Sequence, residues 1–278
     1  PHTPTATLSG VETIDNSFVS LSVAGSGTSV GNYTATATLQ GAKANNYQLS
    51  VATSTTSFSI GKSAPIVTSP TAATSLVYNG ANQALLATAG STNGGTLKYS
   101  IDGKNWTTDV PQAKSAQEYT IYYKVEGDAN HSDVATKTLN AVIEPKLLTV
   151  DWGTRTFEYD GNPHKPTPLL SGVVTGDQVV ITANGEKTAV GTYPSQATLS
   201  GNDAANYKLA SGADQTTFDI TKAAVTVSAP TAETLTYNGK KQNLVLAATT
   251  SAGTVEYSIN NGTSWSETIP AATDAGLY

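Results

Sequence analysis

The sequence lacks cysteine and methionine and contains a single arginine, Arg155, among 278 residues. Without cysteine, the chain has no disulfide bond, thiol nucleophile or thiolate-bound metal ion. Charged residues make up only 13% of the chain, against an ordinary ~25%, and the net charge is −6. Because nucleic-acid binding depends on cations that neutralise phosphates, we expect no nucleic-acid partner. No run approaches the ~20 apolar residues of a membrane helix, so we expect no membrane insertion of this segment.

What the chain has instead is threonine and tyrosine in alternating patterns. It contains 44 threonines and 13 tyrosines, residue types that favour half-buried strands. Apolar and polar residues alternate over 33–39, 96–101 and 120–125, and we find no stretch of sustained helical spacing. Gly, Asn, Asp or Pro interrupts these runs every 8–12 residues, as in β-sandwiches and barrels. The sequence therefore predicts an all-β protein of small Ig-like, sandwich-type modules, with β-grasp-like modules as the alternative.

The chain repeats itself after about 160 residues. The segment that begins GNYTATATLQG at 31 returns as GTYPSQATLSG at 191, and both segments close on a phenylalanine-containing strand and a lysine. The aromatic and proline positions that recur in register are Tyr33 and Tyr193, Tyr47 and Tyr207, Phe58 and Phe218, Trp106 and Trp265, and Pro111 and Pro270. Such a register indicates a tandem-repeat architecture.

A half-period divides the chain further. The triplet Tyr159-Asp160-Gly161 lies between two Tyr-Asn-Gly triplets, at 78–80 and at 237–239. We therefore predict four repeats in A-B-A-B order. They are the first repeat (1–62), the second repeat (63–145), the third repeat (146–222) and the fourth repeat (223–278).

The two outer repeats are shorter than the inner ones. In our alignment the first lacks a counterpart of 146–162, and the fourth lacks a counterpart of 120–145. The chain also begins at Pro1 without an initiator methionine. We therefore expect an excerpt or a processed product of a longer repetitive polypeptide, whose neighbouring repeats would be partners of this segment.

The three aromatic triplets are predicted to be turns. Asn-Gly and Asp-Gly favour two-residue hairpin turns in which both residues have positive φ. We expect Tyr78, Tyr159 and Tyr237 to pack on the core of their modules with the hydroxyl near the rim.

These motifs resemble a known class of repeats. The Y-D-G and Y-N-G triplets, G-T-Y-P with A-T-L-S-G from 191, A-A-N-Y-K-L-A from 204 and the closing F-D-I-T-K are similar to the mostly-β, glycine-rich MBG or YDG repeats of bacterial cell-surface adhesins. The second and fourth repeats have asparagine in place of the aspartate of the triplet, and they resemble a companion type that alternates with the first. The resemblance implies an extracellular, non-enzymatic stalk or adhesion role and no particular ligand.

No residue stands out as catalytic. The three histidines are His2, His131 and His164, and the first and last are repeat equivalents in P-H-T-P and P-H-K-P, which favours a structural role in a Pro-rich turn. A Ser-His-Asp arrangement needs a base that a third group orients, and no serine lies in a strand-to-helix elbow. We therefore predict no enzyme, no catalytic residue and no cofactor.

One segment has the alternating oxygen ligands of a calcium loop. It runs from Asp128 to Asp133, but it lacks the glycine at the sixth position and has Leu139 where such a loop has glutamate. We interpret it as a polar loop and predict no metal site.

Three tryptophans are candidates for sugar stacking. The segment 100–106, S-I-D-G-K-N-W, resembles the Asp-box turn of sialidases and sugar-binding proteins, in which the aspartate caps the turn and the tryptophan anchors it. Trp265 repeats Trp106, and Trp152 is the third candidate. We interpret these residues as scaffold; flat exposure of the rings would instead make them sugar platforms.

We therefore expect an elongated array that serves as the stalk of a bacterial cell-surface adhesin and extends a distal binding region from the cell. The alternative is an array of carbohydrate-binding modules in a secreted or surface protein. Beyond neighbouring repeats, a surface glycan or protein of the host or the bacterium is the partner that this function would have.

Overall fold

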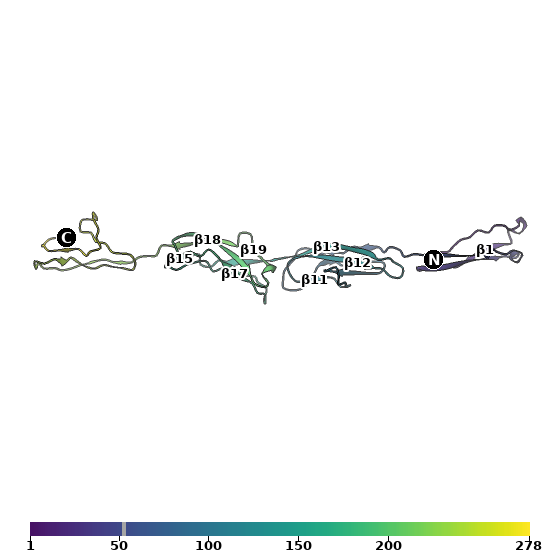
Figure 1. The fold of residues 1–278 in the computed structure, drawn as a ribbon, viewed down its shortest axis with the longest axis horizontal. Helices are drawn as coiled ribbons and strands as arrows, with labels where there is room; N and C mark the ends of the chain where they lie inside the picture. Colours follow the sequence, from purple (N-terminus) through teal and green to yellow (C-terminus); the bar gives the residue numbers. More distant parts are fainter. Residues whose placement is uncertain (52–53) are drawn as a thin grey trace. The chain divides into compact units, whose positions relative to one another are not determined.

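A computed structural model of the chain describes residues 1–51 and 54–278. The protein is all-β, as the sequence predicts, and its ribbon consists of strands, turns and loops (Figure 1). The described residues contain no α-helix, and their helical turns are three short 3-10 turns: η1 (Thr13–Asp15), η2 (Ala44–Asn46) and η3 (Ala204–Asn206). None of these has the length and apolar character that crossing a bilayer requires of a helix.

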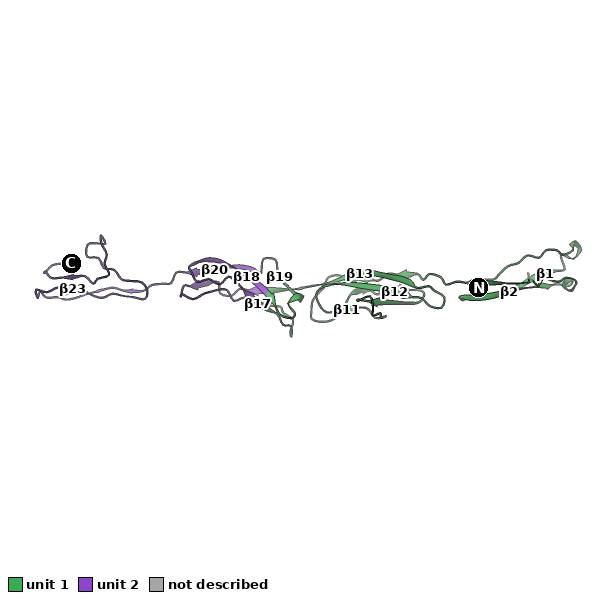
Figure 2. Ribbon diagram, viewed as in Figure 1, with its two compact units in different colours: residues 1–149, 170–180, 199–211 green, residues 150–169, 181–198, 212–278 purple. Residues whose placement is uncertain are grey.

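The chain forms two compact units. Unit 1 comprises 1–149, 170–180 and 199–211, and unit 2 comprises 150–169, 181–198 and 212–278 (Figure 2). The third repeat therefore contributes segments to both units. The division into four repeats is a property of the sequence alignment and stays a prediction.

In unit 1 the first repeat forms one antiparallel sheet in the order β1-β2-β3. Its strands are β1 (Ser20–Ala24), β2 (Gly31–Gln40) and β3 (Thr55–Ile60). Tyr33 on β2 lies opposite Phe58 on β3, and their rings stack 5.4 Å apart. Of the hydrophobic residues here, only Val19 and Ala35 are buried among the described residues, so this sheet has a thin core.

The second repeat is the most deeply packed part of unit 1. Its main sheet has the order β10-β12-β13-β6, in which β12 and β13 are long antiparallel neighbours and β6 runs parallel to β13. These strands are β6 (Leu76–Val77), β10 (Thr96–Ser100), β12 (Glu118–Glu126) and β13 (Val134–Glu144). Three short pairs face them: β4 (Val67–Thr68) with β9 (Ser91–Thr92), β5 (Thr71–Ala72) with β8 (Leu86–Thr88), and β7 (Gln83–Ala84) with β11 (Gln112–Ala113). Alternation along β12 and β13 places Ile121 and Ile143 in the fully buried core, and Leu85, which lies between β7 and β8, is buried in the same cluster.

Part of the third repeat continues this core. The sheet β16-β14-β19 comprises β14 (Lys146–Asp151), β16 (Leu169–Ser171) and β19 (Tyr207–Leu209), with β14 and β19 parallel. Leu148 on β14 and Tyr207 on β19 are buried in the same cluster as Leu85 and Ile143 of the second repeat. The two repeats therefore share one apolar core at this boundary.

Unit 2 contains the rest of the third repeat. Its sheet has the order β15-β20-β18-β17, and its strands are β15 (Thr156–Glu158), β17 (Val180–Ala183), β18 (Gly191–Ser200) and β20 (Gln215–Thr221). Phe218 on β20 is buried and packs edge-on against Phe157 and at a tilt against Tyr193. These aromatic contacts, together with the buried Ile220 and Ala197, form the core of this sheet.

The fourth repeat, also in unit 2, is built from short pairs. These are β21 (Val227–Ser228) with β25 (Thr249–Thr250), β22 (Thr231–Ala232) with β24 (Val245–Leu246), and β23 (Gln242–Asn243) with β26 (Ala271–Ala272). Several of its large apolar side chains, including Leu235 and Ile259, are exposed.

Candidate functional site: a junction between repeats

The Tyr78-Asn79-Gly80 turn lies where the second and third repeats meet. Tyr78 follows β6, and its backbone N–H donates to the carbonyl oxygen of Glu144 over 2.9 Å, which extends the parallel pairing of β6 with β13. The Tyr78 side chain is 1% exposed. This agrees with the sequence-based expectation of a tyrosine packed on the core.

The turn itself differs from the prediction. The expected hairpin with two positive φ angles is wrong, because only the glycine of each triplet has a positive φ: +82° at Gly80 and at Gly161, and +70° at Gly239. In addition, β6 and β7 do not pair with each other but with β13 and β11. The physical reason is an Asx-type turn, in which Asn79 Oδ1 accepts a hydrogen bond from the Ala81 N–H over 2.9 Å.

The expectation that all three triplet tyrosines pack on a core is also wrong for two of them. Tyr159 is 44% exposed and Tyr237 is 66% exposed. Of the three triplet tyrosines, only Tyr78 is buried.

The carboxylate of Asp177 joins two tyrosines at the junction. Asp177 Oδ2 accepts a hydrogen bond of 2.7 Å from the Tyr78 hydroxyl and a short one from the Tyr207 hydroxyl. The Tyr207 hydroxyl in turn accepts from the Val174 N–H over 2.9 Å. The rings of Tyr78 and Tyr207 meet edge to face, with centroids 5.3 Å apart and planes at 75°. We refer to Tyr78, Gly80, Val174, Asp177 and Tyr207 as the junction.

Hydrogen bonding and burial set the charge states of the junction. The hydroxyls of Tyr207 and then Tyr78 stabilise the carboxylate and hold the pKa of Asp177 below its ordinary value. Burial, followed by the hydrogen bond to Asp177, raises the pKa of Tyr78 and of Tyr207. At neutral pH the junction is therefore one carboxylate held by two neutral phenols, a charge-assisted arrangement.

Close packing, a hydrogen bond and an ion pair reinforce the junction. A Cβ atom placed on Gly80 would lie 2.6 Å from Val174 Cγ1, so a larger residue at this position would have to displace the Val174 side chain. Nearby, the Ala116 N–H donates to Asn206 Oδ1 over 2.9 Å. Lys208 Nζ also lies 3.1 Å from Glu144 Oε2, in an exposed ion pair of little energetic weight. The boundary at Pro145 is thus a packed joint.

The candidate calcium loop is a polar joint between the first and second repeats. Asp128 Oδ1 accepts from the N–H groups of Asn130 and His131, and its Oδ2 accepts from the Gly95 N–H. Asn130 Oδ1 accepts from the Val30 N–H over 3.0 Å, and Lys62 Nζ donates to the Asp128 carbonyl oxygen over 2.7 Å. These oxygens therefore accept hydrogen bonds that fix the loop itself and hydrogen bonds that join it to the first repeat. Across residues 1–51 and 54–278 there is no group of three or more His, Asp or Glu side chains placed to share a metal ion.

Each histidine holds a local segment in place. His131 Nδ1 and His164 Nε2 lie 2.8 Å from Oδ1 of Asp128 and Asp160, respectively. His164 also stacks on Phe157, with centroids 4.9 Å apart. The backbone of His164 exchanges two hydrogen bonds with Lys187, as that of its equivalent His2 does with Gly27. This equivalence agrees with the structural role inferred from the repeated Pro-His motif.

The Asp-box-like turn has the geometry that the motif predicts. Asp102 Oδ1 accepts from the N–H groups of Lys104 and Asn105, each over 2.8 Å, and from the Ser100 hydroxyl. These hydrogen bonds, with those of the backbone first, lower the pKa of Asp102. The aspartate therefore caps the turn as scaffold.

The three tryptophans lie in different environments. Trp106 is partly buried and has Lys124 Nζ over its ring, 4.5 Å from the centroid. Trp152 is also partly buried and donates from Nε1 to the Ala213 carbonyl oxygen. Trp265 is 61% exposed and borders a pocket of about 440 Å³ beside Tyr257 and Ile259.

Asp177 is not among the residues predicted from the sequence. A signal for it is nonetheless present, because L-S-G-V-x-T-x-D occurs twice, ending at Asp15 and at Asp177. The repeated aspartate and the repeated tyrosine are the residues that hydrogen-bond to each other, Asp15 with Tyr47 and Asp177 with Tyr207.

Comparisons with protein-family models, with curated proteins and with solved structures find no match to this chain.

Proposed function

We propose that the chain is a non-enzymatic structural stalk, the repeat region of an extracellular adhesin on a bacterial cell surface. The junction carries this proposal. A stalk must transmit force through the boundaries between its repeats. A boundary with a buried tyrosine, a doubly hydrogen-bonded carboxylate and a shared apolar core resists bending and separation better than a flexible linker does.

The second joint supports the same function by different chemistry. In the 127–133 loop, the Asn130 side-chain oxygen accepts a hydrogen bond from the Val30 N–H, and the Asp128 carbonyl oxygen accepts one from Lys62 Nζ. The bacterial and cell-surface parts of the proposal rest on the resemblance of the motifs to MBG or YDG repeats.

Small-angle X-ray scattering of the whole chain tests the proposal. A compact globule of 278 residues would have a radius of gyration of about 19 Å. Four repeats of strands of about eight residues would extend over about 100 Å or more, and a rod of that length has a radius of gyration near 30 Å. We expect the larger value together with a β-type circular dichroism spectrum, which excludes expansion by unfolding. A folded chain with a radius near 19 Å would contradict the stalk.

One observation favours the alternative of a carbohydrate-binding array. Trp265 is exposed beside Tyr257 and Ile259 at a pocket, a combination that can stack a sugar ring. Glycan-array binding by the whole chain that Trp265→Ala abolishes and Trp106→Ala retains would establish this alternative. Absence of glycan binding would contradict this alternative.

A further inference from the structure

Parallel backbone pairing holds the first residue of the second repeat. Ser63 forms a parallel bridge with His131, shortly before β13 begins. The Ser63 N–H donates to the Asn130 carbonyl oxygen over 3.0 Å, and the Ser132 N–H donates to the Ser63 carbonyl oxygen over 2.8 Å. We refer to Ser63 and 130–132 as the start contact.

A second parallel pairing holds the last residues of the same repeat. β6 runs parallel to β13, with Val77 opposite Glu144. The hydrogen bond of 2.9 Å from the Tyr78 N–H to the Glu144 carbonyl oxygen extends this pairing by one residue. We refer to 76–78 and 143–144 as the end contact.

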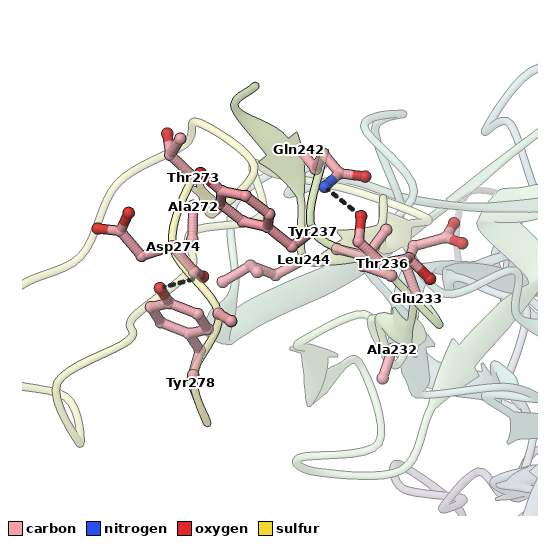
Figure 3. A pocket seen from close by; sticks show the side chains of 13 residues that line it. Ala232, Glu233, Thr236, Tyr237, Gln242, Leu244, Ala272, Thr273, Asp274 and Tyr278 are labelled. Carbon is pink, nitrogen blue, oxygen red and sulfur yellow. Dashed lines mark hydrogen bonds between the residues drawn. The ribbon is translucent and has the colours of Figure 1, made fainter. Parts of the chain in front are cut away.

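A local hydrogen bond shapes the strand of the end contact. Gln83 Nε2 donates to the Val77 carbonyl oxygen over 3.1 Å. The fourth repeat has the same bond, from Gln242 Nε2 to the Thr236 carbonyl oxygen over 3.1 Å (Figure 3). Neither bond involves the last strand of a repeat. The strand and its turn are therefore shaped within a few residues of sequence, and the pairing with β13 is a separate, long-range interaction.

The third repeat has both kinds of contact, with different residues. At its start, Lys146 on β14 lies opposite Tyr207 on β19 in a parallel pairing within unit 1. At its end, β15 runs parallel to β20 within unit 2, and the Tyr159 N–H donates to the Thr221 carbonyl oxygen over 2.9 Å. The triplet tyrosine therefore extends the end pairing in both inner repeats, although the two repeats are of different sequence type.

The start and end contacts of the second repeat lie at opposite ends of β13. This strand has 11 residues, so at ~3.3 Å per residue it is about 35 Å long. The chain enters the repeat at Ser63, beside the beginning of β13, and leaves it after Glu144, at the end of the strand. Tension applied to the two ends of the repeat is therefore directed along β13.

Parallel pairing determines how this tension acts on the backbone hydrogen bonds. Tension pulls Ser63 and β6 toward the start of the chain, and it pulls β13 toward the end. In a parallel pair these opposite pulls slide the strands past each other, so the bonds of a contact are stretched together. In an antiparallel hairpin pulled at its two ends, the strands separate sideways and the bonds break one after another.

We propose that the start and end contacts form a mechanical clamp, through which β13 carries tension across the second repeat. The short pairs β4–β9, β5–β8 and β7–β11 lie outside this path and stay folded until the clamp breaks. The inference rests on the proposed stalk, because tension reaches the repeat when the array is held at both ends.

Single-molecule pulling on the whole chain in two directions tests the proposal. Because the chain lacks cysteine, pairs of introduced cysteines define where the handles attach. Gly61→Cys with Leu147→Cys loads both contacts along β13, whereas Ala81→Cys with Leu147→Cys pulls β6 and β13 apart from one end. All three positions are exposed. At equal loading rates we expect at least a twofold higher rupture force for the first pair, and equal forces would overturn the proposal.

Two measurements separate the direction of load from changes in the fold. Both cysteine pairs should keep the urea midpoint of the wild type, so a difference in rupture force reflects how the repeat is pulled. Ser63→Pro removes the N–H of the start contact that donates to Asn130. It should lower the rupture force of the 61–147 direction and leave that of the 81–147 direction unchanged, because the second direction does not load Ser63. An equal change in both directions, or no change in either, would overturn the role of the start contact.

A disulfide across the end contact identifies the second repeat when the array is pulled at its two termini. Val77 and Glu144 are exposed and opposite in register, and paired strands lie ~4.8 Å apart, within the Cα separation of disulfides. In Val77→Cys/Glu144→Cys, oxidised with glutathione disulfide, the 66 residues from 78 to 143 cannot extend. One rupture event should then lose about 220–240 Å of extension, and dithiothreitol should restore it.

The force of that event decides the proposal independently of the cysteine handles. We expect it in the range of the 61–147 direction, and a value at or below that of the 81–147 direction would overturn the clamp. Such a result would leave an extended chain in the scattering test unaffected. Conversely, a compact chain in scattering would contradict the stalk without changing the dependence of rupture force on direction.

Discussion

The hydroxyl of Tyr78 donates a 2.7 Å hydrogen bond to Oδ2 of Asp177, a residue 99 positions further along the chain. The contact joins a turn of one repeat to a loop of the next, and the apolar cluster around Leu148 and Tyr207 continues across the same boundary. Repeats that share an interface in this way stabilise each other, as in other one-dimensional arrays. We therefore expect the second repeat to unfold together with the adjoining segments of the third.

The first prediction concerns the Tyr78 hydroxyl. Tyr78→Phe should lower the free energy of unfolding by about 1–2 kcal/mol, because a buried hydrogen bond to a charged group is lost while the ring packing remains. Urea denaturation followed by circular dichroism measures this loss. Tyr237→Phe is the matched control, because the same residue of the fourth repeat is exposed, and its substitution should be nearly neutral. Equal effects of the two substitutions would show that the Tyr78 hydrogen bond to Asp177 contributes no stability.

The second prediction concerns the close approach of Gly80 to Val174. An alanine at either Gly80 or Gly239 meets a positive φ, which costs about 1–2 kcal/mol for an L-residue. Only at Gly80 would the added Cβ also lie 2.6 Å from Val174 Cγ1, whereas at Gly239 the nearest atom is 4.0 Å away. Gly80→Ala should therefore destabilise the protein by a further ~1–3 kcal/mol of overpacking relative to Gly239→Ala.

The two glycine variants are compared by thermal or urea unfolding of the whole chain. Replacing Val174 with alanine removes the Cγ1 atom that the new methyl group meets. Gly80→Ala combined with Val174→Ala should therefore lose less stability than the sum of the two single substitutions. Strict additivity would contradict the packing explanation.

Local features of the fold followed from the sequence because their causes are local. Alternation predicts strands such as β2 and β12, and the aspartate of the Asp-box-like motif caps the turn after Ser100 through backbone N–H groups two and three residues away. In each case the residues that determine the local structure lie within a few positions of one another. Periodicity and turn chemistry are therefore sufficient to place them.

The junction could not be predicted in the same way because its partners are distant. Tyr78, Tyr159 and Tyr237 stand in nearly the same triplet, yet only Tyr78 is buried. What distinguishes it is a neighbouring segment that carries Val174 and Asp177, and no spacing within the second repeat specifies that neighbour. Local motifs define the shape of the turn, and burial depends on what packs against it.

The third prediction concerns alkaline pH. Burial raises the pKa of Tyr78 and Tyr207 above the ordinary value near 10, so the folded state keeps both phenols neutral after the unfolded state begins to ionise. Their contribution to stability is therefore complete below pH 10 and is lost as the pH rises above it. Unfolding free energies between pH 8 and 11 should fall on the alkaline side, and Tyr78→Phe should reduce the slope. A slope that this substitution leaves unchanged would contradict the assignment.

The fourth prediction concerns acid. Hydrogen bonds from the backbone and side chain of Asn162, and then from His164, lower the pKa of Asp160 to about 2. Because the folded-state pKa is depressed below the unfolded value of about 3.9, the stabilisation is present above pH 4 and is lost as the pH falls toward 2. Asp128 and Asp177 have depressed pKa values too, so the whole chain should lose stability in this direction.

Asp160→Asn isolates one contribution to this acid response. The substitution should preserve the turn, because Asn79 and Asn238 at the equivalent positions cap it with their side-chain oxygens over 2.9 Å. An amide does not titrate, so the decline in unfolding free energy between pH 4 and pH 2 should be shallower in the variant than in the wild type. Urea midpoints at pH 5, 4, 3 and 2 measure both slopes. Parallel slopes would mean that the hydrogen bonds around Asp160 do not favour its charged form, and the acid sensitivity would then have to arise at the other depressed carboxylates.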